Sequence, residues 1–381
     1  MTTVLQKLSL NAYRGFAGLV LENLTPVSLV VGANNSGKSS ILEAAGLFLR
    51  PPDPTQWVNA VRHRDLDMSL VDGLLAMFSD SAFDGSGDGD GSGDGSGSGS
   101  GPGYGDGSGS GSGAGYGDGS GDGSGAGVDL RKRAIELVGE LRGANRSVVA
   151  RSWSASRLAD DGAEQAGVRI EVSVDGAPPI ALKFPGPAVA HQVPMYRVFT
   201  VTPATHYSTK ALVEQLSRVV DEGKKQLAVE LLQVFDKEVE DLDVIASLGR
   251  EAVRVTHRAR GVVDLASFGD GMRRSAALAL ALTRASQGVL LIDEIEAGIH
   301  HSVLRPVLSK LLAAAATSQV QLLATTHSLE AVDAIIGSIE DRSTPDALSA
   351  FWVQRQDGKH EVRRYDFAKL CTLREGGLDI R

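Results

Sequence analysis

The stretch LVVGANNSGKSSILEAA, from Leu29 to Ala45, decides the fold of this chain. An apolar run leads into a loop that opens at Gly32, and a helical pattern of apolar residues follows Gly37-Lys38-Ser39, which is the order strand, loop, helix. Backbone N–H groups of such a loop wrap phosphates at the helix N-terminus, the lysine reaches the β and γ phosphates, and the serine hydroxyl binds magnesium. The stretch therefore predicts a nucleoside triphosphate site. Its expected nucleotide-binding residues are Gly32, Asn34, Asn35, Ser36, Gly37, Lys38, Ser39 and Ser40.

Length and composition indicate which broad class of protein the chain belongs to. The chain has 381 residues, which is enough for one large domain or two modest ones, and a formal net charge of -9. Its single cysteine, Cys371, cannot form an internal disulfide, which favours a reducing compartment. The sequence shows no leader pattern and no apolar run of membrane-spanning length. We expect a soluble, cytoplasmic protein without a membrane partner.

A low-complexity tract runs from Asp84 to Gly127. Every second residue is Gly, most of the others are Ser or Asp, and seven Asp occur without any Lys or Arg, so the rest of the chain is close to neutral. Such a segment cannot bury enough apolar surface to fold, and we interpret it as a disordered, solvated tether. The alternative is a calcium site, but the Gly-Gly-x-Gly-x-Asp nonapeptide with its apolar anchor is absent.

Three segments of the second half carry further candidate chemistry. SFGDG (267–271) places a glycine-containing loop at the start of a strongly helical run, which is the geometry of a second anion site. In GVLLIDEIEAGIHH, a buried strand at 289–292 ends at Asp293-Glu294, and two carboxylates there would face the nucleotide crevice. VQLLATTHS has the same arrangement of a buried strand followed by a polar residue, with a strand at 320–324 and His327 just past its end.

The remaining elements follow from hydrophobic periodicity. We expect one helical face at Leu130, Ala134, Leu137, Val138 and Leu141, and two amphipathic helices in 208–239 that form a small helical lobe. Strands are expected at 4–10, 18–21, 147–153, 168–174, 180–184, 196–201, 351–354 and 361–365, and those between 147 and 184 form an antiparallel insert.

Taken in order, GANNSGKSS, SFGDGMRR, LLIDEIEAGIHH and LLATTHS resemble the ATP-binding set of an ABC-type ATPase. The Ser-x-Gly-x-Gly signature resembles the RecF, SMC and OLD (overcoming lysogenisation defect) branch, and within it the standalone OLD-like ATPases that lack a Toprim nuclease domain. The resemblance covers residues 1–50 and about 195–381. It implies an α/β fold, an ABC-type P-loop ATPase head with a mixed central sheet, an antiparallel β insert and a small helical lobe. The head would comprise 1–83 and 128–381, with the tract at 84–127 between them.

The resemblance also implies roles for individual residues. Lys38 would bind the phosphates of ATP, Ser39 the magnesium ion, and Asp293 would support that metal through water. Glu294 would be the general base that orients and deprotonates the attacking water. His327 would be the switch histidine that contacts the γ-phosphate.

Two residues near the N-terminus extend the expected ATP site. Tyr13 and Arg14 are candidates for stacking on adenine, and for Tyr13 the alternative is packing in the core.

The signature predicts a homodimer. Ser267, Gly269, Gly271 and Arg273 would serve the nucleotide of a second subunit, because each chain's own nucleotide is already held by its phosphate loop, and a head-to-tail symmetric dimer with two sandwiched ATP molecules satisfies both needs. Cations at a helix start oppose the helix dipole. We therefore expect at least one of Arg273 and Arg274 to contact a phosphate; the alternative is a solvated pair.

The sequence leaves the wider function open between two hypotheses. The first is an ATPase that controls an effector, a nuclease encoded separately, in bacterial anti-phage defence; the second is an ATP-gated DNA-binding clamp in repair or recombination. The basic clusters at 131–133 and at Arg254, Arg258 and Arg260 are either solvated faces or a DNA track. The metal-sensing glutamine of ABC proteins has no clear equivalent, and Gln192 and the Thr202-Pro203 step are its candidates. The sequence does not specify which effector is controlled, what triggers the ATPase, whether a higher oligomer forms or what the tract at 84–127 does.

Overall fold

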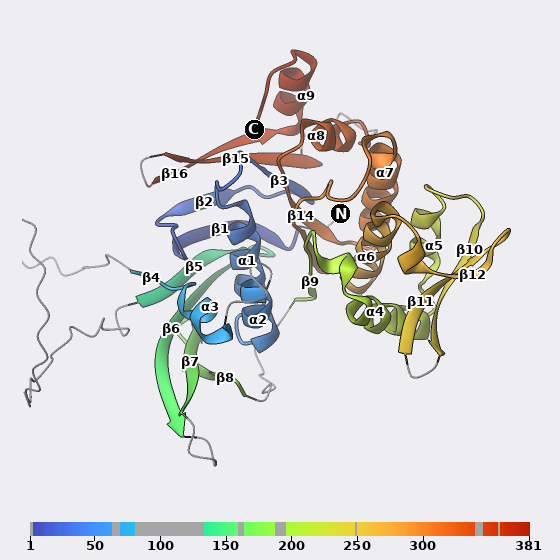
Figure 1. Cartoon of the computed structure of the whole chain (residues 1–381). Helices are drawn as coiled ribbons and strands as arrows, with labels where there is room; N and C mark the ends of the chain where they lie inside the picture. Colours follow the sequence, from blue (N-terminus) through green and yellow to red (C-terminus); the bar gives the residue numbers. More distant parts are fainter. Residues whose placement is uncertain are drawn as a thin grey trace, which may run out of the picture.

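The computed structural model describes residues 3–62, 69–80, 133–158, 164–186, 196–247, 250–339, 346–356 and 359–381. The tract at 84–127, Arg131-Lys132 and Gln192 lie outside these described residues. Within them the chain forms three sheets with helices packed around the central one (Figure 1). The α/β class predicted from the sequence is confirmed.

The central sheet carries the phosphate loop. Its strands run in the order β16-β15-β3-β14-β13-β9, and all pair in parallel except β16, which is antiparallel to β15. Leu29 and Val31 of β3 contribute to one hydrophobic core, and Val30 between them contributes to the other. Both faces of the central sheet are therefore buried, which explains why its strands are continuous apolar runs. The strands are β3 (Val27–Val31), β9 (Val198–Val201), β13 (Val289–Ile292), β14 (Gln321–Thr326), β15 (Leu348–Gln356) and β16 (Lys359–Asp366).

A second, antiparallel sheet has the order β2-β1-β5-β6-β7-β8, with β4 beside β5. The antiparallel strands predicted between 147 and 184 are present. Because β5 pairs with β1, they continue the N-terminal sheet. The strands are β1 (Leu5–Ala12), β2 (Leu19–Glu22), β4 (Ser79–Asp80), β5 (Arg133–Leu141), β6 (Ala144–Leu158), β7 (Glu164–Val174) and β8 (Ile180–Phe184).

The helix expected over Leu130, Ala134, Leu137, Val138 and Leu141 is wrong, because Arg133–Leu141 forms strand β5. Ile135 and Leu137 are buried, whereas Glu136 and Val138 are half-buried, so the side chains alternate between the two faces. At Gly139, a Cβ atom would lie 2.1 Å from the carbonyl oxygen of Lys7 on β1. Pairing with two strands, β1 and β6, overrides the local helical spacing.

The helical lobe is larger than predicted. Its two amphipathic helices are present as α4 (Thr209–Asp221) and α5 (Gln226–Leu232). An unpredicted three-stranded antiparallel sheet follows, formed by β10 (Val239–Ser247), β11 (Arg250–His257) and β12 (Gly261–Asp264). The lobe, which we define as residues 205–264, is therefore mixed α/β.

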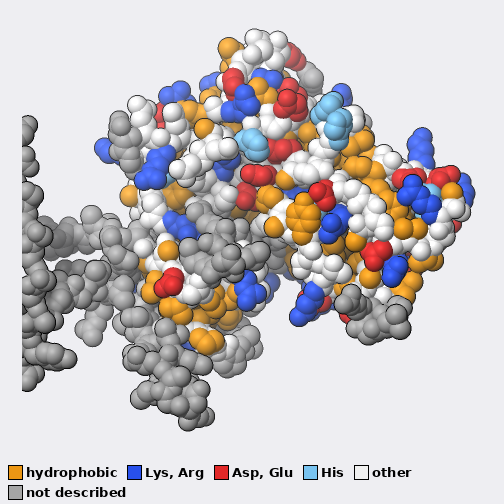
Figure 2. All heavy atoms as spheres, viewed as in Figure 1, with side chains coloured by type: hydrophobic (Ala, Val, Ile, Leu, Met, Phe, Trp, Pro, Cys, Tyr) orange, Lys and Arg blue, Asp and Glu red, His pale blue; other side chains and the backbone are white. Residues whose placement is uncertain are grey.

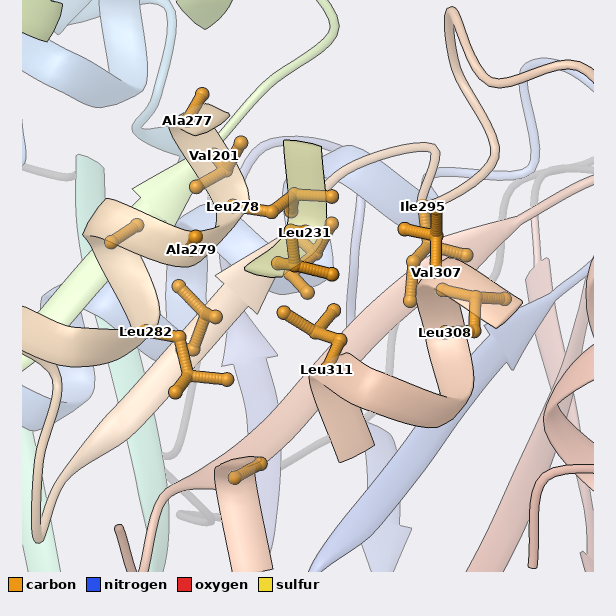
Figure 3. Packing of buried hydrophobic residues seen from close by; sticks show 14 of the residues in the cluster. Val201, Leu231, Ala277, Leu278, Ala279, Leu282, Ile295, Val307, Leu308 and Leu311 are labelled. Atoms are coloured by element: carbon orange, nitrogen blue, oxygen red, sulfur yellow. The ribbon is translucent and has the colours of Figure 1, made fainter. Parts of the chain in front are cut away.

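The remaining helices cover the sheets. Helix α6 packs against α5, α7 and β9 through residues such as Leu278, Leu231, Leu311 and Val201 (Figure 3). These helices are α1 (Lys38–Leu49), α2 (Pro54–Arg62), α3 (Leu70–Leu75), α6 (Asp270–Arg284), α7 (His301–Thr317), α8 (Leu329–Ile336) and α9 (Phe367–Glu375).

A buried glutamine joins the first strand to the central sheet. Gln321, at the start of β14, is only 1% exposed. Its Oε1 accepts the backbone N–H groups of Val4 (2.9 Å) and Leu5 (2.7 Å), and its Nε2 donates to the carbonyls of Leu5 (2.8 Å) and Thr25 (3.0 Å). One side chain therefore satisfies four buried backbone groups.

We expect Gln321→Ala to lower the free energy of unfolding by about 2 to 4 kcal/mol, because it leaves these backbone groups buried without partners. Gln226→Ala, at an exposed position of α5, is the control and should change it by less than about 0.5 kcal/mol. Urea denaturation measures both. A Gln321→Ala value as small as that of the control would show that the glutamine does not hold the sheets together.

Candidate functional site

A cavity of about 470 Å³ lies at the carboxyl end of the central sheet. It brings together segments far apart in the sequence, because β3, β13 and β9 all end at this edge. Nine of the predicted site residues line it: Arg14, Asn34, Asn35, Gly37, Lys38, Ser39, Ser40, Asp293 and Glu294.

The phosphate loop, residues 32–39, depends on glycine at two positions. Gly32 has φ 153°, and a Cβ atom there would lie 2.3 Å from the carbonyl oxygen of Val353. Gly37 has φ 92°, and its Cβ would lie 2.4 Å from the ring of Phe16. Asn35 between them also has a positive φ of 63°. Helix α1 begins directly afterwards at Lys38, so its first N–H groups, which have no partner within a helix, point into the loop.

Lys38 is held inside this loop. Its Nζ donates to the carbonyls of Gly32 and Ala33, each at 2.8 Å. Burial lowers the pKa of Lys38, and the nearby carboxylates of Asp293 and Glu294 oppose that shift. The Ser36 hydroxyl is buried in the same loop without a hydrogen-bond partner among the described residues. A cationic side chain, backbone donors and an unpaired hydroxyl form a donor set that fits a polyphosphate.

Asp293 and Glu294 follow β13 and are fixed by a threonine of the next strand. The hydroxyl of Thr325 donates to Asp293 Oδ1 at 2.5 Å and accepts the backbone N–H of Glu294 at 2.8 Å. Glu294 has a φ of 47°, a left-handed conformation that costs a non-glycine residue about 1 to 2 kcal/mol. Thr325 was not singled out from the sequence as a site residue. The Ser39 hydroxyl and the Asp293 carboxylate are oxygen ligands of the kind that magnesium prefers.

His327 lies beside this site and does not line the cavity. Its side chain is 47% exposed, and its Nδ1 lies 3.3 Å from Glu296 Oε1. That same oxygen accepts the backbone N–H of His327 at 3.2 Å, whereas Glu296 Oε2 is buried without a partner among the described residues. Glu296 was not singled out from the sequence, although it stands two residues after Glu294.

The signature loop, residues 267–271, lies at the N-terminus of α6, outside the cavity lining. Ser267 and Gly269 are exposed. The two arginines that follow are not a solvated pair, so that alternative is wrong. Arg273 donates to the carbonyl of His206 at 3.0 Å and has a side chain only 16% exposed, and Arg274 is fully buried and cannot reach a partner's phosphate.

Near the N-terminus, Tyr13 packs in the core and does not reach a nucleotide. It is fully buried, its hydroxyl donates to Glu43 Oε2 at 3.0 Å, and burial raises its pKa. Arg14 does line the cavity, with its Nε donating to the same carboxylate oxygen at 2.8 Å. Phe16 and His360, with ring centroids 4.0 Å apart, also line the cavity, and neither was singled out from the sequence.

Asp236, Glu238 and His257 in the lobe have the composition of a metal site, but their hydrogen bonds argue against one. His257 Nδ1 accepts the backbone N–H groups of Ala259 (3.1 Å) and Arg260 (3.2 Å). The ring must therefore carry its proton on Nε2, which lies 3.0 Å from Asp236 Oδ2 and donates to it. No nitrogen lone pair is left for a metal.

The chain matches the family model described as "AAA domain, putative AbiEii toxin, Type IV TA system" over residues 196–333. An uncharacterized protein of Methanocaldococcus jannaschii is 30% identical over 116 residues, an alignment that covers 30% of this chain and 99% of that protein. A second uncharacterized protein of the same organism is 44% identical over 46 residues, which cover 12% of this chain and 21% of that protein. The chain belongs to this family of AAA-domain P-loop ATPases.

Among solved structures, the SMC head domain from Thermotoga maritima matches with a TM-score of 0.43 and 13% identity over 95% of this chain and 99% of that one. A Pyrococcus furiosus Smc head domain with an extended coiled coil, bound to the C-terminal domain of ScpA, matches with a TM-score of 0.48 and 12% identity over 98% and 99%. The fold of this chain is mixed α/β, with several sheets. Across the described part of the chain, none of the helices is long and apolar enough to cross a membrane.

We expect Thr325→Val to lower ATP turnover by about 10- to 100-fold, because valine keeps the shape of the side chain but releases both the Asp293 carboxylate and the Glu294 backbone. Thr325→Ser keeps the hydroxyl and should stay within about threefold of the parent. Steady-state phosphate release measures both. Equal rates in the valine variant and the parent would contradict a role for Thr325 in positioning the carboxylates.

Proposed function

We propose that this chain binds and hydrolyses ATP with magnesium, dimerises around the nucleotide, and uses that cycle to control a separate effector. The observation that carries the proposal is that Lys38, Ser39, Asp293 and Glu294 line one cavity. These are the residue types that cradle phosphates, hold a divalent cation and activate water.

Within the proposed site each group has a distinct task. Lys38 exchanges the two loop carbonyls for phosphate oxygens. Ser39 and Asp293 hold magnesium, which supplies neutralising charge to the phosphates when it is bound. Glu294 orients the attacking water and accepts its proton. Glu294 suits this task because its backbone is fixed by Thr325 and the residue lines the cavity.

The proposed dimer follows from where the signature loop lies. Ser267 and Gly269 are exposed at the start of a 15-residue helix and do not line their own chain's cavity. A second copy, docked head to tail, brings its nucleotide to this helix N-terminus and receives the same contact in return. Gly271 and Arg273 belong to the same proposed contact, and His327 reaches the γ-phosphate from beside the cavity.

The narrower assignment to standalone OLD-like ATPases of anti-phage defence, with a nuclease-like effector, is part of the proposal. The description of the matched family supports a regulated system, since it names a toxin of a toxin–antitoxin system. The order of the four motifs supports the ABC-type mechanism on which such control would rest.

The alternative, an ATP-gated DNA clamp, is less well supported by the charges on the lobe. Arg258 pairs with Glu240 at 2.9 Å, and Arg254 lies 4.0 Å from Asp264. Figure 2 shows basic and acidic side chains interspersed at the right of the view, where β10–β12 lie. A DNA track needs unpaired cations along one face, so these arginines fit solvated ion pairs better. DNA binding that falls steeply with salt would instead favour the clamp.

We expect Lys38→Ala to lose ATP binding while keeping the fold, because the ammonium group is needed only when phosphates are present. Binding of a fluorescent ATP analogue and the thermal unfolding curve measure the two properties. Lys183→Ala, an exposed lysine of β8, is the control and should bind like the parent. Turnover at the parental rate in Lys38→Ala would overturn the assignment of the phosphate loop.

The sharper test concerns Glu294→Gln, which keeps the shape of the side chain but cannot accept a proton. We expect near-normal ATP affinity, turnover reduced by at least about 100-fold, and accumulation of the closed dimer. Light scattering with ATP and magnesium should show the mass double.

Ser267→Arg should have the opposite effect on the dimer and prevent it from forming. A bulky cation in the signature loop should block closure while each monomer still binds ATP. If Glu294→Gln shows no ATP-dependent mass shift, or turns over ATP like the parent, the shared-site mechanism is wrong for this protein.

A further inference from the structure

Arg260 is an exposed arginine that lies beside the signature loop. It belongs to the turn between β11 and β12, and its Cζ lies 5.7 Å from the centroid of the Phe268 ring, which is part of that loop. The ring of His257 stacks near Phe268 with 6.5 Å between the centroids, and its Nδ1 accepts the backbone N–H of Arg260 at 3.2 Å. The turn is thus held against the signature loop, and the guanidinium group lies next to it.

The two other arginines near this turn whose side chains are described already have acidic neighbours. The guanidinium group of Arg258 donates to Glu240 at 2.9 Å, and that of Arg254 lies 4.0 Å from Asp264. Both cations are therefore at least partly neutralised within the lobe.

The two arginines of α6 are also used within their own chain. Arg273 donates to the carbonyl of His206 at 3.0 Å and lies 3.7 Å from Asp270. Arg274 is fully buried and donates to three backbone carbonyls directly after β9 and β13. Neither presents a guanidinium group whose donors are all available at the surface.

Arg260 differs from these four arginines. No hydrogen bond or ion pair joins its side chain to the described part of the chain. The Glu238 N–H and the His257 ring lower the pKa of Asp236, and the more distant charge of Arg260 adds to their effect. That carboxylate is already occupied, because it accepts the Glu238 N–H and the His257 Nε2–H, each at 3.0 Å. The guanidinium donors of Arg260 are therefore available to an anion from outside the chain.

A nucleotide that docks on the signature loop would need such a cation. Asp264 and Asp270 flank the loop with side chains 35% and 48% exposed, and both carboxylates repel phosphates. The N-terminus of α6 opposes them with only about half a positive charge. A Cβ atom at Gly269 would meet no atom within 4 Å, so the loop faces open space. Arg260 can supply the missing charge, and its planar fork matches phosphate oxygens.

We propose that Arg260 contacts the phosphates of the ATP bound by the partner subunit and stabilises the charge on the γ-phosphate oxygens during hydrolysis. The reaction is the one already proposed. Water adds to the γ phosphorus, the bond to the β–γ bridging oxygen breaks, ADP leaves, and Glu294 of the ATP-bearing subunit accepts the proton. This inference rests on the proposed function, since it needs a dimer that shares ATP.

Arg260→Ala tests the inference first. We expect kcat to fall by about 100-fold, because a charge-stabilising group is lost. The affinity of each monomer for a fluorescent ATP analogue should stay within about threefold, because Arg260 does not line the cavity of its own chain. Arg260→Gln keeps the length of the side chain without its charge, so it should lose kcat alike and covers a failure of the alanine variant to fold.

Arg258→Ala is the matched control in the same turn. Its side chain is 70% exposed and is paired with Glu240, so kcat should stay within about twofold of the parent. Parental kcat in Arg260→Ala, or an equal loss in Arg258→Ala, would overturn the assignment of Arg260.

Mixing two inactive variants shows whether Arg260 acts on the partner's nucleotide. In a mixed dimer of Arg260→Ala and Glu294→Gln, the ATP site of the Arg260→Ala subunit has its own Glu294 and receives Arg260 from the partner subunit. Mixed in equal amounts before ATP is added, the variants should recover roughly a quarter of the parental turnover, because half of the dimers are mixed and each has one intact site.

No recovery in the mixture would mean that Arg260 acts within its own subunit, and the inference would be wrong. Failure of the proposed function is distinguishable from this outcome, since the parent protein would then show no ATP turnover or no ATP-dependent increase of mass in light scattering.

Discussion

The candidate site depends on one constraint, the order in which four parallel strands stand side by side. β3, β14, β13 and β9 are adjacent, so their carboxyl ends meet at one edge of the sheet. Both faces of the sheet are buried, which leaves that edge as the place where polar side chains can gather. The phosphate loop, the carboxylates of Asp293 and Glu294, and Thr325 each follow or end one of these strands, and none would lie near the others in a different strand order.

Sequence reasoning predicted the parts of this arrangement that are encoded locally. The apolar runs before Gly32 and before Asp293-Glu294 predicted strands, and the structure has strands there. Lys38, Asp293 and Glu294, which follow these strands, line one cavity. Strand β5 was mistaken for a helix because its pairing with β1 joins residues more than a hundred positions apart. The two adjacent arginines could not be distinguished, since a one-residue step along a helix turns the side chain by about 100°. That turn takes Arg274 into the core and leaves Arg273 beside His206.

The charges of the site divide into fixed and exchangeable ones. Arg274 is held by three carbonyls of the fold itself, so its cation belongs to the scaffold. Lys38 is held by two carbonyls of a loop that also presents free N–H groups, so its cation can change partners when an anion arrives. The carboxylates of Asp293, Glu294 and Glu296 favour the charged form of both cations. Two cations and three carboxylates therefore already interact in this region before a nucleotide brings further negative charge.

The pairing of β3 bears on how the protein is made. Residues 27–31 hydrogen-bond with 322–326 on one side and with 348–352 on the other. The phosphate loop is synthesised long before the two strands that flank β3, because these strands lie about 290 residues or more further along the chain. Such long-range pairing delays folding and leaves apolar strands exposed meanwhile. A translation product that stops before residue 322 therefore carries the phosphate-loop motif without the strands that hold β3 in the central sheet.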